Sequence, residues 1–423
     1  MDNLEHDRGI LRKLAERIAE IAALPVQEEK KRLWRALNGL KPERPMVTID
    51  QVCWNEMNID GKLDLQCETA ECRAYEEKFR KTLLQWEYFP VDMVVEPCIR
   101  VPMAIEPFNQ DPLAVMNRIF GVAIREHTLA TDNANDIVSH DYENQFKTIE
   151  DVEKIKMPVI VHDKAETKRR MDMADWLFDG IMPRKREGWF DHYLSVWDPI
   201  AMWMSVEGIL YGFIDEPEMM HALVKRVVDG YMVMLDQLEE QRLIYAGENL
   251  IHTTGAWTSD LPAPGFDPEK PRTQDVWMYA MAQALATVSP AMYEEYEIEP
   301  LMPLFNRFGL VYYGCCDPLE LKLDAVKRIP HVRKISVSPW ADREKMAEQI
   351  GGDYVVSNKP NPAFLAGTTF DGSQIRKDLE RTLEICKRTG SPLEFAFKDI
   401  STLRYDPLRL KQVNDIAMKA VGA

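Results

Sequence analysis

The sequence lacks features that would place it in a membrane or secreted class. No stretch approaches the ~20 consecutive apolar residues of a membrane-spanning helix. The first residues are polar and acidic, without the basic and apolar segments of a signal peptide. The 7 cysteines are odd in number and scattered over 423 residues, which is not typical of a disulfide framework. We therefore expect a cytoplasmic protein.

Positive charge is also scarce. The chain has 52 Lys and Arg residues against 69 Asp and Glu residues, which gives a formal net charge of −17. Because an acidic surface repels nucleic acid and anionic membranes, we expect no partner of either kind. No Gly-x-Gly-x-x-Gly or Gly-x-x-x-x-Gly-Lys-Ser/Thr motif opens a helix, which argues against the common nucleotide-binding folds.

What the chain has is an alternation of strand-like and helical segments. Strands are predicted at residues 44–50, 92–96, 192–197, 249–253, 310–314, 333–337, 353–357 and 394–398, and helices at 8–24, 25–38, 69–89, 217–247 and 292–308. Roughly eight such units suit a (β/α)8 TIM barrel better than a doubly wound sheet. We predict one TIM-barrel domain over residues 1–423. It has an N-terminal helical extension (1–40) and an irregular, antiparallel insertion (98–150), with strand-like stretches at 122–129 and 136–139.

The residues just past each predicted strand are the first candidates for chemistry. In a TIM barrel the active site lies at the carboxyl ends of the strands, in the loops that follow them. That rule selects Asp50, Glu96, Asp198, His252, Cys315, Cys316, Asp317, Ser338, Lys359 and Asp399.

The most informative of these segments is Gly309-Leu-Val-Tyr-Tyr-Gly-Cys-Cys-Asp-Pro318. An apolar run ends in a glycine, and two thiols and a carboxylate follow. Because strand side chains alternate, at most one of the two thiols points to the barrel axis while the strand lasts. The pair suits two small buried residues, a nucleophile with a histidine base, or metal ligands. We favour a zinc site, with Cys316, Cys315, His252 and Asp317 as the predicted ligands.

Other polar and aromatic residues complete the predicted site. The predicted catalytic residues are Asp260, Asp198 and Lys359, and the predicted substrate-binding residues are Trp197, Met204, Trp257, Tyr313, Ser357 and Asn361. The chain is rich in Met (22) and Trp (10), which suits either core filling or a pocket for a flat apolar ligand. For two residues a simpler role is open: Lys359 as a surface lysine and Asp260 as a loop cap.

Several segments resemble the uroporphyrinogen decarboxylase superfamily, in the same order and spacing along nearly the whole chain. They are Arg35-Ala-Leu-Asn-Gly-Leu-Lys-Pro-Glu-Arg-Pro-Met-Val47, Ser205-Val-Glu-Gly-Ile-Leu-Tyr-Gly-Phe-Ile-Asp-Glu-Pro217, Val288-Ser-Pro-Ala-Met-Tyr-Glu-Glu-Tyr296, Tyr313-Gly-Cys-Cys-Asp-Pro-Leu319, Ile335-Ser-Val-Ser-Pro-Trp-Ala-Asp342 and Ser357-Asn-Lys-Pro-Asn-Pro362. The superfamily also contains zinc-dependent methyltransferases that exchange methyl groups with a corrinoid protein. The resemblance implies a (β/α)8 barrel.

Departures from the family pattern narrow the expected reaction. Residues 47–57 contain no arginine, whereas the decarboxylases carry an Arg-rich loop there that grips porphyrin carboxylates. The methyltransferases bind zinc with a His-x-Cys pair and a later Cys. By register the pair falls near Tyr313 and Cys315, or near Gly314 and Cys316, so the histidine is missing. The later region, around residues 358–362, has no cysteine.

Methyl transfer nevertheless fits the sequence best. A methyl group on oxygen, nitrogen or sulfur leaves more readily when a Lewis acid or a proton donor activates its leaving group. The chain has no Asp-x-His-x-x-Gly corrinoid signature. The resemblance therefore implies a component that activates a methylated small molecule for transfer to or from a separate corrinoid protein, with a methoxylated aromatic as a candidate substrate. The resemblance also implies that the protein can form a homodimer.

Two other functions stay open. A decarboxylase acting on a small or tetrapyrrole carboxylic acid would bring basic groups such as Arg100, Lys359 and Lys398 to the pocket. A non-catalytic binding protein would have a closed pocket with ordinary ionisable groups.

Overall fold

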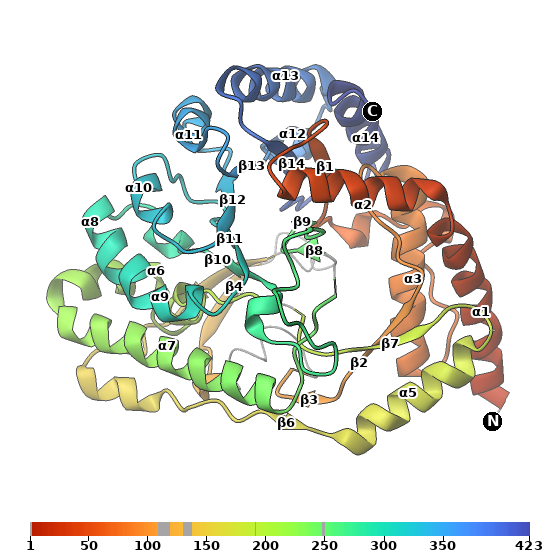
Figure 1. Ribbon diagram of the computed structural model, residues 1–423, viewed down its shortest axis with the longest axis horizontal. Coiled ribbons are helices and arrows are strands. Elements are labelled where there is room, and N and C mark those ends of the chain that lie inside the picture. Colours follow the sequence, from red (N-terminus) through yellow and green to blue (C-terminus); the bar gives the residue numbers. More distant parts are fainter. Residues whose placement is uncertain (1, 109–118, 130–137, 191, 248–249) are drawn as a thin grey trace.

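A curled parallel sheet is the largest element of the fold (Figure 1). The computed structural model describes residues 2–108, 119–129, 138–190, 192–247 and 250–423. Six strands pair in the order β1 (Met46–Ile49), β14 (Leu393–Phe397), β13 (Val355–Asn358), β12 (Val332–Val337), β11 (Leu310–Tyr313) and β10 (Trp277–Ala280). Their Val, Ile, Phe and Tyr residues suit strands that are buried on both faces. Because the pairing is parallel, the carboxyl ends of all six strands lie at one edge.

Helices cover the outside of this sheet, as Figure 1 shows for α11, α13 and α14. The helices are α1 (Asp2–Ala22), α2 (Pro25–Asn38), α3 (Ala70–Tyr88), α5 (Lys164–Phe178), α6 (Trp197–Asp215), α7 (Pro217–Glu240), α8 (Pro290–Tyr293), α9 (Glu299–Phe305), α10 (Leu323–Val326), α11 (Arg343–Ile350), α12 (Ala363–Ala366), α13 (Gly372–Thr389) and α14 (Leu408–Ala420). A π-helical turn, Glu294–Ile298, joins α8 to α9. Within the described residues, no helix combines the length and the apolar composition needed to cross a membrane.

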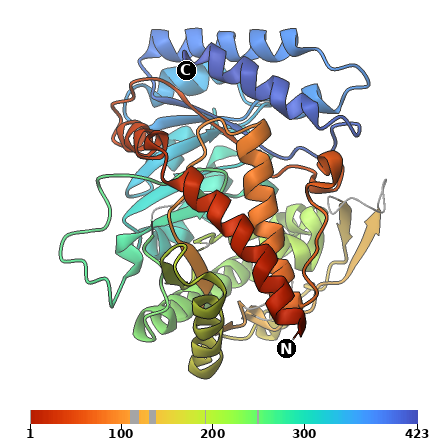
Figure 2. The same cartoon turned by 90° about the vertical axis from the view of Figure 1, so that its right-hand side faces the viewer.

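The predicted helices agree with the structure except at their ends. The stretches 8–24 and 25–38 correspond to α1 and α2, and 69–89 corresponds to α3. Figure 2 shows α1 lying along α3, and their apolar faces share a buried cluster with α5. The stretch 217–247 is helical only to Glu240, and 292–308 is divided by the π-helical turn.

Five predicted strands are present with their ends shifted by at most two residues: 44–50, 310–314, 333–337, 353–357 and 394–398. The strand β10 was not predicted. Its sequence, Trp277-Met-Tyr-Ala280, is too short an apolar run to be distinguished from a buried helical turn by periodicity.

The rest of the predicted barrel is less regular. Residues 92–96 form no strand. Beside β1, the Asp92 amide donates to the Val47 carbonyl at 3.1 Å, and the Asp92 carboxylate accepts from the Val47 amide at 2.8 Å. In 192–197 only Tyr193 pairs, with Tyr279 at the free edge of β10, before α6 begins. The described residues therefore show a six-stranded parallel half-barrel in place of the predicted regular (β/α)8 barrel.

Short strand pairs occupy this less regular half. β2 (Ile99–Pro102) pairs in parallel with β7 (Arg184–Glu187), and β3 (Ile105–Glu106) pairs antiparallel with β6 (Val161–His162). Within the predicted insertion, β4 (Glu126–Leu129) and β5 (Ser139–Tyr142) form the expected antiparallel pair. Residues 109–118 and 130–137 of that segment lie outside the described residues.

A small hairpin lies inside the curve of the sheet (Figure 1). It replaces the predicted strand 249–253 and consists of β8 (Leu250–Ile251) and β9 (Thr254–Gly255). Thr254 donates its hydroxyl to Glu394 of β14 at 2.7 Å, and the Thr253 carbonyl accepts from Thr48 of β1 at 2.7 Å. These contacts fix the hairpin against the inner face of the sheet.

Candidate functional site

The turn after β11 places both thiols at the carboxyl edge of the sheet. Gly314 has φ +91°, a conformation that residues with a side chain rarely adopt, and a Cβ there would lie 2.7 Å from Leu319. The Cys315 carbonyl accepts from the Ser336 hydroxyl at 2.6 Å, which ties the turn to β12. Cys315 is therefore buried, whereas Cys316 is partly exposed.

Lys398, the residue after β14, meets the Cys315 thiol. Its Nζ lies 2.9 Å from Cys315 Sγ and 3.2 Å from His252 Nε2. The two sulfur atoms are 3.6 Å apart, and Cys316 Sγ lies 3.5 Å from an Asp399 carboxylate oxygen. We call His252, Cys315, Cys316, Lys398 and Asp399 the thiol–lysine cluster.

Electrostatics favour a thiolate at Cys315. A hydrogen bond from the Cys316 thiol, opposed by burial and aided by His252 and Lys398, lowers the pKa of Cys315 well below its ordinary value. Burial alone would lower the pKa of Lys398, but the neighbouring thiolate outweighs it, and the pKa of Lys398 is raised. The surroundings thus favour a buried thiolate–ammonium pair at Cys315 and Lys398.

A second buried lysine lies beside this pair. Lys359 donates to the Tyr312 hydroxyl, which in turn lies 2.9 Å from the Ser357 hydroxyl. Burial, with repulsion from Lys398, lowers the pKa of Lys359 to about 8. A lysine with that pKa can exchange a proton near neutral pH.

An acid also faces the cluster from α6. Asp198 accepts a hydrogen bond from the Tyr193 hydroxyl. Burial raises the pKa of Asp198 to about 6, and the negative charge of Cys315 contributes to that rise. Asp198 can therefore hold a proton in slightly acidic solution.

The backbone around the cluster is strained. His252 has φ +52°, Asp399 has φ +55° and Gln51, next to the strand end of β1, has φ +50°. Left-handed conformations of non-glycine residues cost about 1–3 kcal/mol each and gather at functional sites. The ring of His252 is also fixed by stacking on Tyr279, with ring centres 4.0 Å apart and planes 9° from parallel.

The structure does not bring all the predicted site residues together. Asp260 pairs with Arg333 at 2.7 Å, near the amino end of β12, at the opposite edge of the sheet from the cluster. Trp257 packs against the first residues of β1 and β13, away from the thiols, and also lines the pocket described below. The predicted substrate residues Trp197 and Met204 are buried in the main core.

Three more predicted residues have local structural partners. Tyr313 donates to Glu297 at 2.9 Å, and Asn361 accepts from the Ala363 amide at 2.9 Å. Asp317 is buried and accepts from the Cys315 amide at 3.2 Å. These contacts place Tyr313 and Asp317 behind the thiols, on the helix side of the sheet.

The predicted zinc set does not fit this arrangement. The Lys398 ammonium lies against the Cys315 thiol and the His252 ring nitrogen that would have to bind the metal. The Asp317 carboxylate is engaged by the Cys315 amide and the Tyr293 hydroxyl. Among the residues that the structure describes, no three His, Cys or carboxylate side chains converge as metal ligands. We derive no chemical step through zinc.

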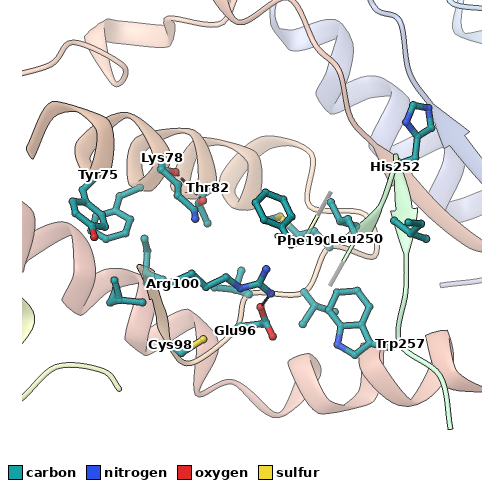
Figure 3. A pocket seen from close by; sticks show the side chains of 17 residues that line it. Tyr75, Lys78, Thr82, Glu96, Cys98, Arg100, Phe190, Leu250, His252 and Trp257 are labelled. Carbon is teal, nitrogen blue, oxygen red and sulfur yellow. Dashed lines mark hydrogen bonds and ion pairs between the residues drawn. The ribbon is translucent and has the colours of Figure 1, made fainter. Parts of the chain in front are cut away.

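A pocket of about 530 Å³ borders the cluster through His252 (Figure 3). Its walls come from α3, the segment leading into β2, and β8. The residues that line it are Ile18, Tyr75, Lys78, Phe79, Thr82, Met93, Val94, Val95, Glu96, Cys98, Ile99, Arg100, Phe190, Leu250, Ile251, His252 and Trp257. Its volume suits a small organic ligand. The sequence singled out only Glu96, Arg100, His252 and Trp257 among these residues. The others do not lie just past a predicted strand, so the rule used to select candidates does not reach them.

Comparison with known proteins supports the fold alone. No model of a known protein family matches the chain, and no curated protein matches it in sequence. Among solved structures, a methyltransferase from Methanosarcina mazei resembles it with a TM-score of 0.51 and 13% sequence identity, over 92% of this chain and 98% of that chain. At this identity the likeness is one of fold.

Proposed function

We propose that this protein is a methyltransferase component that activates a methylated small molecule for transfer to or from a separate corrinoid protein, as in the methyltransferase branch of the uroporphyrinogen decarboxylase superfamily that its motifs resemble. The observation that carries the proposal is the thiol–lysine cluster at the carboxyl ends of the parallel strands, bordered by a pocket. The fold likeness to a methyltransferase supports it. The substrate class is a methoxylated aromatic.

The side chains supply the acid that such a reaction needs. When a methyl group leaves an ether oxygen, the bonding electrons stay on that oxygen, and a proton donor stabilises it. Lys359, with a pKa of about 8, is the donor best matched to neutral pH, and Asp198 is a second candidate. Although Lys359 and Lys398 are buried, the negative charge of the Cys315 thiolate favours the charged form of both. When docked, the corrinoid protein supplies the nucleophile.

A decarboxylase is the second candidate, because Lys359 and Lys398 both approach Cys315. Two ammonium groups would bind a carboxylate substrate. After the carbon–carbon bond breaks and carbon dioxide leaves, one of them would protonate the electron pair left on carbon. This function needs no corrinoid.

Two assays on the same preparation separate the candidates. The first incubates the protein with 3,4-dimethoxybenzoate and cob(I)alamin and measures phenol formation and methylcobalamin absorbance. The second measures carbon dioxide release from the same acid without cobalamin. We expect methyl transfer that Lys359→Met reduces and Lys359→Arg partly restores. Carbon dioxide release without methyl transfer would favour the decarboxylase, and the absence of both reactions would overturn the methyltransferase proposal.

A further inference from the structure

The pocket beside the cluster has a polar side and an apolar side. Lys78 and Thr82 line it from α3, Glu96 lines it from the segment that leads into β2, and Arg100 lines it from β2 itself. Figure 3 shows Lys78 and Thr82 extending from α3 toward Arg100, with His252 at one end of the pocket. Of the thiol–lysine cluster, His252 is the member that lines this pocket.

The carboxylates around the pocket are held by Arg100. Its guanidinium pairs with Glu187 at 3.1 Å and with Glu96, and it lies over the Tyr245 ring at 5.4 Å. Glu187 is only 5% exposed, so its position is fixed by burial as well. Arg100 thus has structural partners on several sides and offers little of its charge to a ligand.

Lys78 is the contrasting cation. Among the described residues, no acceptor lies within hydrogen-bonding or ion-pairing distance of its ammonium group. The Lys78 side chain is exposed at the pocket. Desolvation by the surrounding chain, only partly offset by the more distant Glu187, lowers its pKa. An exposed ammonium group at a pocket, with no partner among the described residues, can form charge-assisted hydrogen bonds to a bound carboxylate.

The apolar side of the pocket fits a flat ring. Phe190 and Leu250 are 46% and 48% exposed, unusually high for large apolar residues. Both line the pocket, and Figure 3 shows them between Lys78 and His252. A ligand that covered them would remove this apolar surface from water, which is favourable.

We propose that this pocket binds an aromatic carboxylate, with the carboxylate at Lys78 and the ring against Phe190 and Leu250, so that the far edge of the ring faces His252. This rests on the proposed function in one respect, namely that the bound compound is the methyl donor. Methoxylated benzoates have both an aromatic carboxylate for the pocket and a methyl group to transfer.

Calorimetric titration of the whole chain with two probes tests the assignment. The probe 3,4-dimethoxybenzoate carries the carboxylate, and 1,2-dimethoxybenzene has the same ring and ethers without it. We expect Lys78→Met to weaken binding of the benzoate by about tenfold to a hundredfold, the range for a lost charge-assisted hydrogen bond. Binding of 1,2-dimethoxybenzene should change little, and Lys78→Arg should keep most of the affinity for the benzoate.

The matched control is Lys81→Met, on the same helix. Lys81 pairs with Glu77 at 2.6 Å, lies over Trp54 and does not line the pocket, so its loss should leave benzoate binding unchanged. Equal loss in both variants, equal affinity of the wild type for both probes, or no benzoate binding would each overturn the inference. Because cobalamin is absent, Lys78-dependent binding without methyl transfer in the separate assay would uphold this inference while the proposed function failed.

Discussion

The parallel half-barrel and the half with short strand pairs build their parts of the site in different ways. In the half-barrel, backbone pairing brings β11 and β14 to one edge, so residues far apart in sequence, such as Cys315 and Lys398, meet at 2.9 Å. In the other half, the pocket walls come from a helix, a loop and the β8–β9 hairpin. The regular half thus places Lys398 against Cys315, whereas in the irregular half Arg100 is paired with carboxylates and Lys78 lines a cavity.

The largest expected effect comes from removing the cation of the half-barrel. Lys398→Met leaves the Cys315 thiolate without its buried counter-charge, so the pKa of Cys315 should rise and methyl transfer should fall by about a hundredfold or more. The pH profile of alkylation by iodoacetamide reports the first change, and the cobalamin assay reports the second. Lys398→Arg keeps the charge and is the control. An unchanged alkylation profile in Lys398→Met would show that the ammonium does not govern the thiol.

Zinc binding gives a second test of the contact between Lys398 and the Cys315 thiol. Because Lys398 lies against both His252 Nε2 and Cys315 Sγ, we expect the wild type to bind less zinc than Lys398→Ala, in which both donors face open space. Elemental analysis after dialysis against zinc under reducing conditions measures this. One zinc per chain in the wild type would show that the lysine yields its place to the metal predicted from sequence.

The hairpin that separates the halves should show a smaller effect, on stability. A Cβ on Gly255 would lie 2.4 Å from the Trp34 ring, which is buried and hydrogen-bonded to the Asp92 carbonyl. Overpacking of this kind costs about 1–3 kcal/mol. We expect Gly255→Ala to lower the urea midpoint accordingly. Gly9→Ala is the control, because a Cβ there meets nothing within 4 Å and the residue has no positive φ. Equal losses in the two variants would contradict the crowding.

The contrast between the halves also explains what could be predicted from sequence. Strands such as β1 and β11 are largely apolar runs with clear ends, so their approximate boundaries and the place of Cys315 could be predicted. The partner of Cys315 could not be identified as Lys398 rather than a metal, because that depends on the register of β11 and β14 in the sheet. Lys78 carries no local signal at all: on α3 it resembles any helical lysine, and only tertiary packing places it in a pocket.

The pH dependence of stability should have opposite signs in the two halves. Behind β11, burial raises the pKa of Glu297 from 4.5 to about 8. The folded protein then keeps a proton that the unfolded chain loses, so this residue's contribution is full below pH 4.5 and is lost as pH rises to about 8. Glu297→Gln should flatten that decline, which amounts to roughly 1.4 kcal/mol per pKa unit at most. Urea unfolding at a series of pH values measures it.

His192, in the other half, gives the matched contrast. Burial lowers its pKa from 6.5 to about 4, so the unfolded chain binds a proton that the folded protein excludes. Stability should therefore fall as pH decreases from 6.5 toward 4, and His192→Gln should reduce that fall. If both variants change the same pH range, the opposite titrations inferred for the two halves are wrong.

The smallest effect is expected at the far edge of the half-barrel. Asp260 is half exposed and pairs with Arg333, which also donates to the Asn38 carbonyl, so Arg333 keeps a partner when the carboxylate is lost. Exposed pairs of this kind contribute about 0–1 kcal/mol. Asp260→Asn should therefore change the urea midpoint little and leave methyl transfer at the wild-type rate, because the cluster lies at the opposite ends of the strands. If Asp260→Asn instead lost as much activity as Lys398→Met at unchanged stability, Asp260 would be catalytic, as predicted from sequence. The reaction would then take place at the amino edge of the sheet.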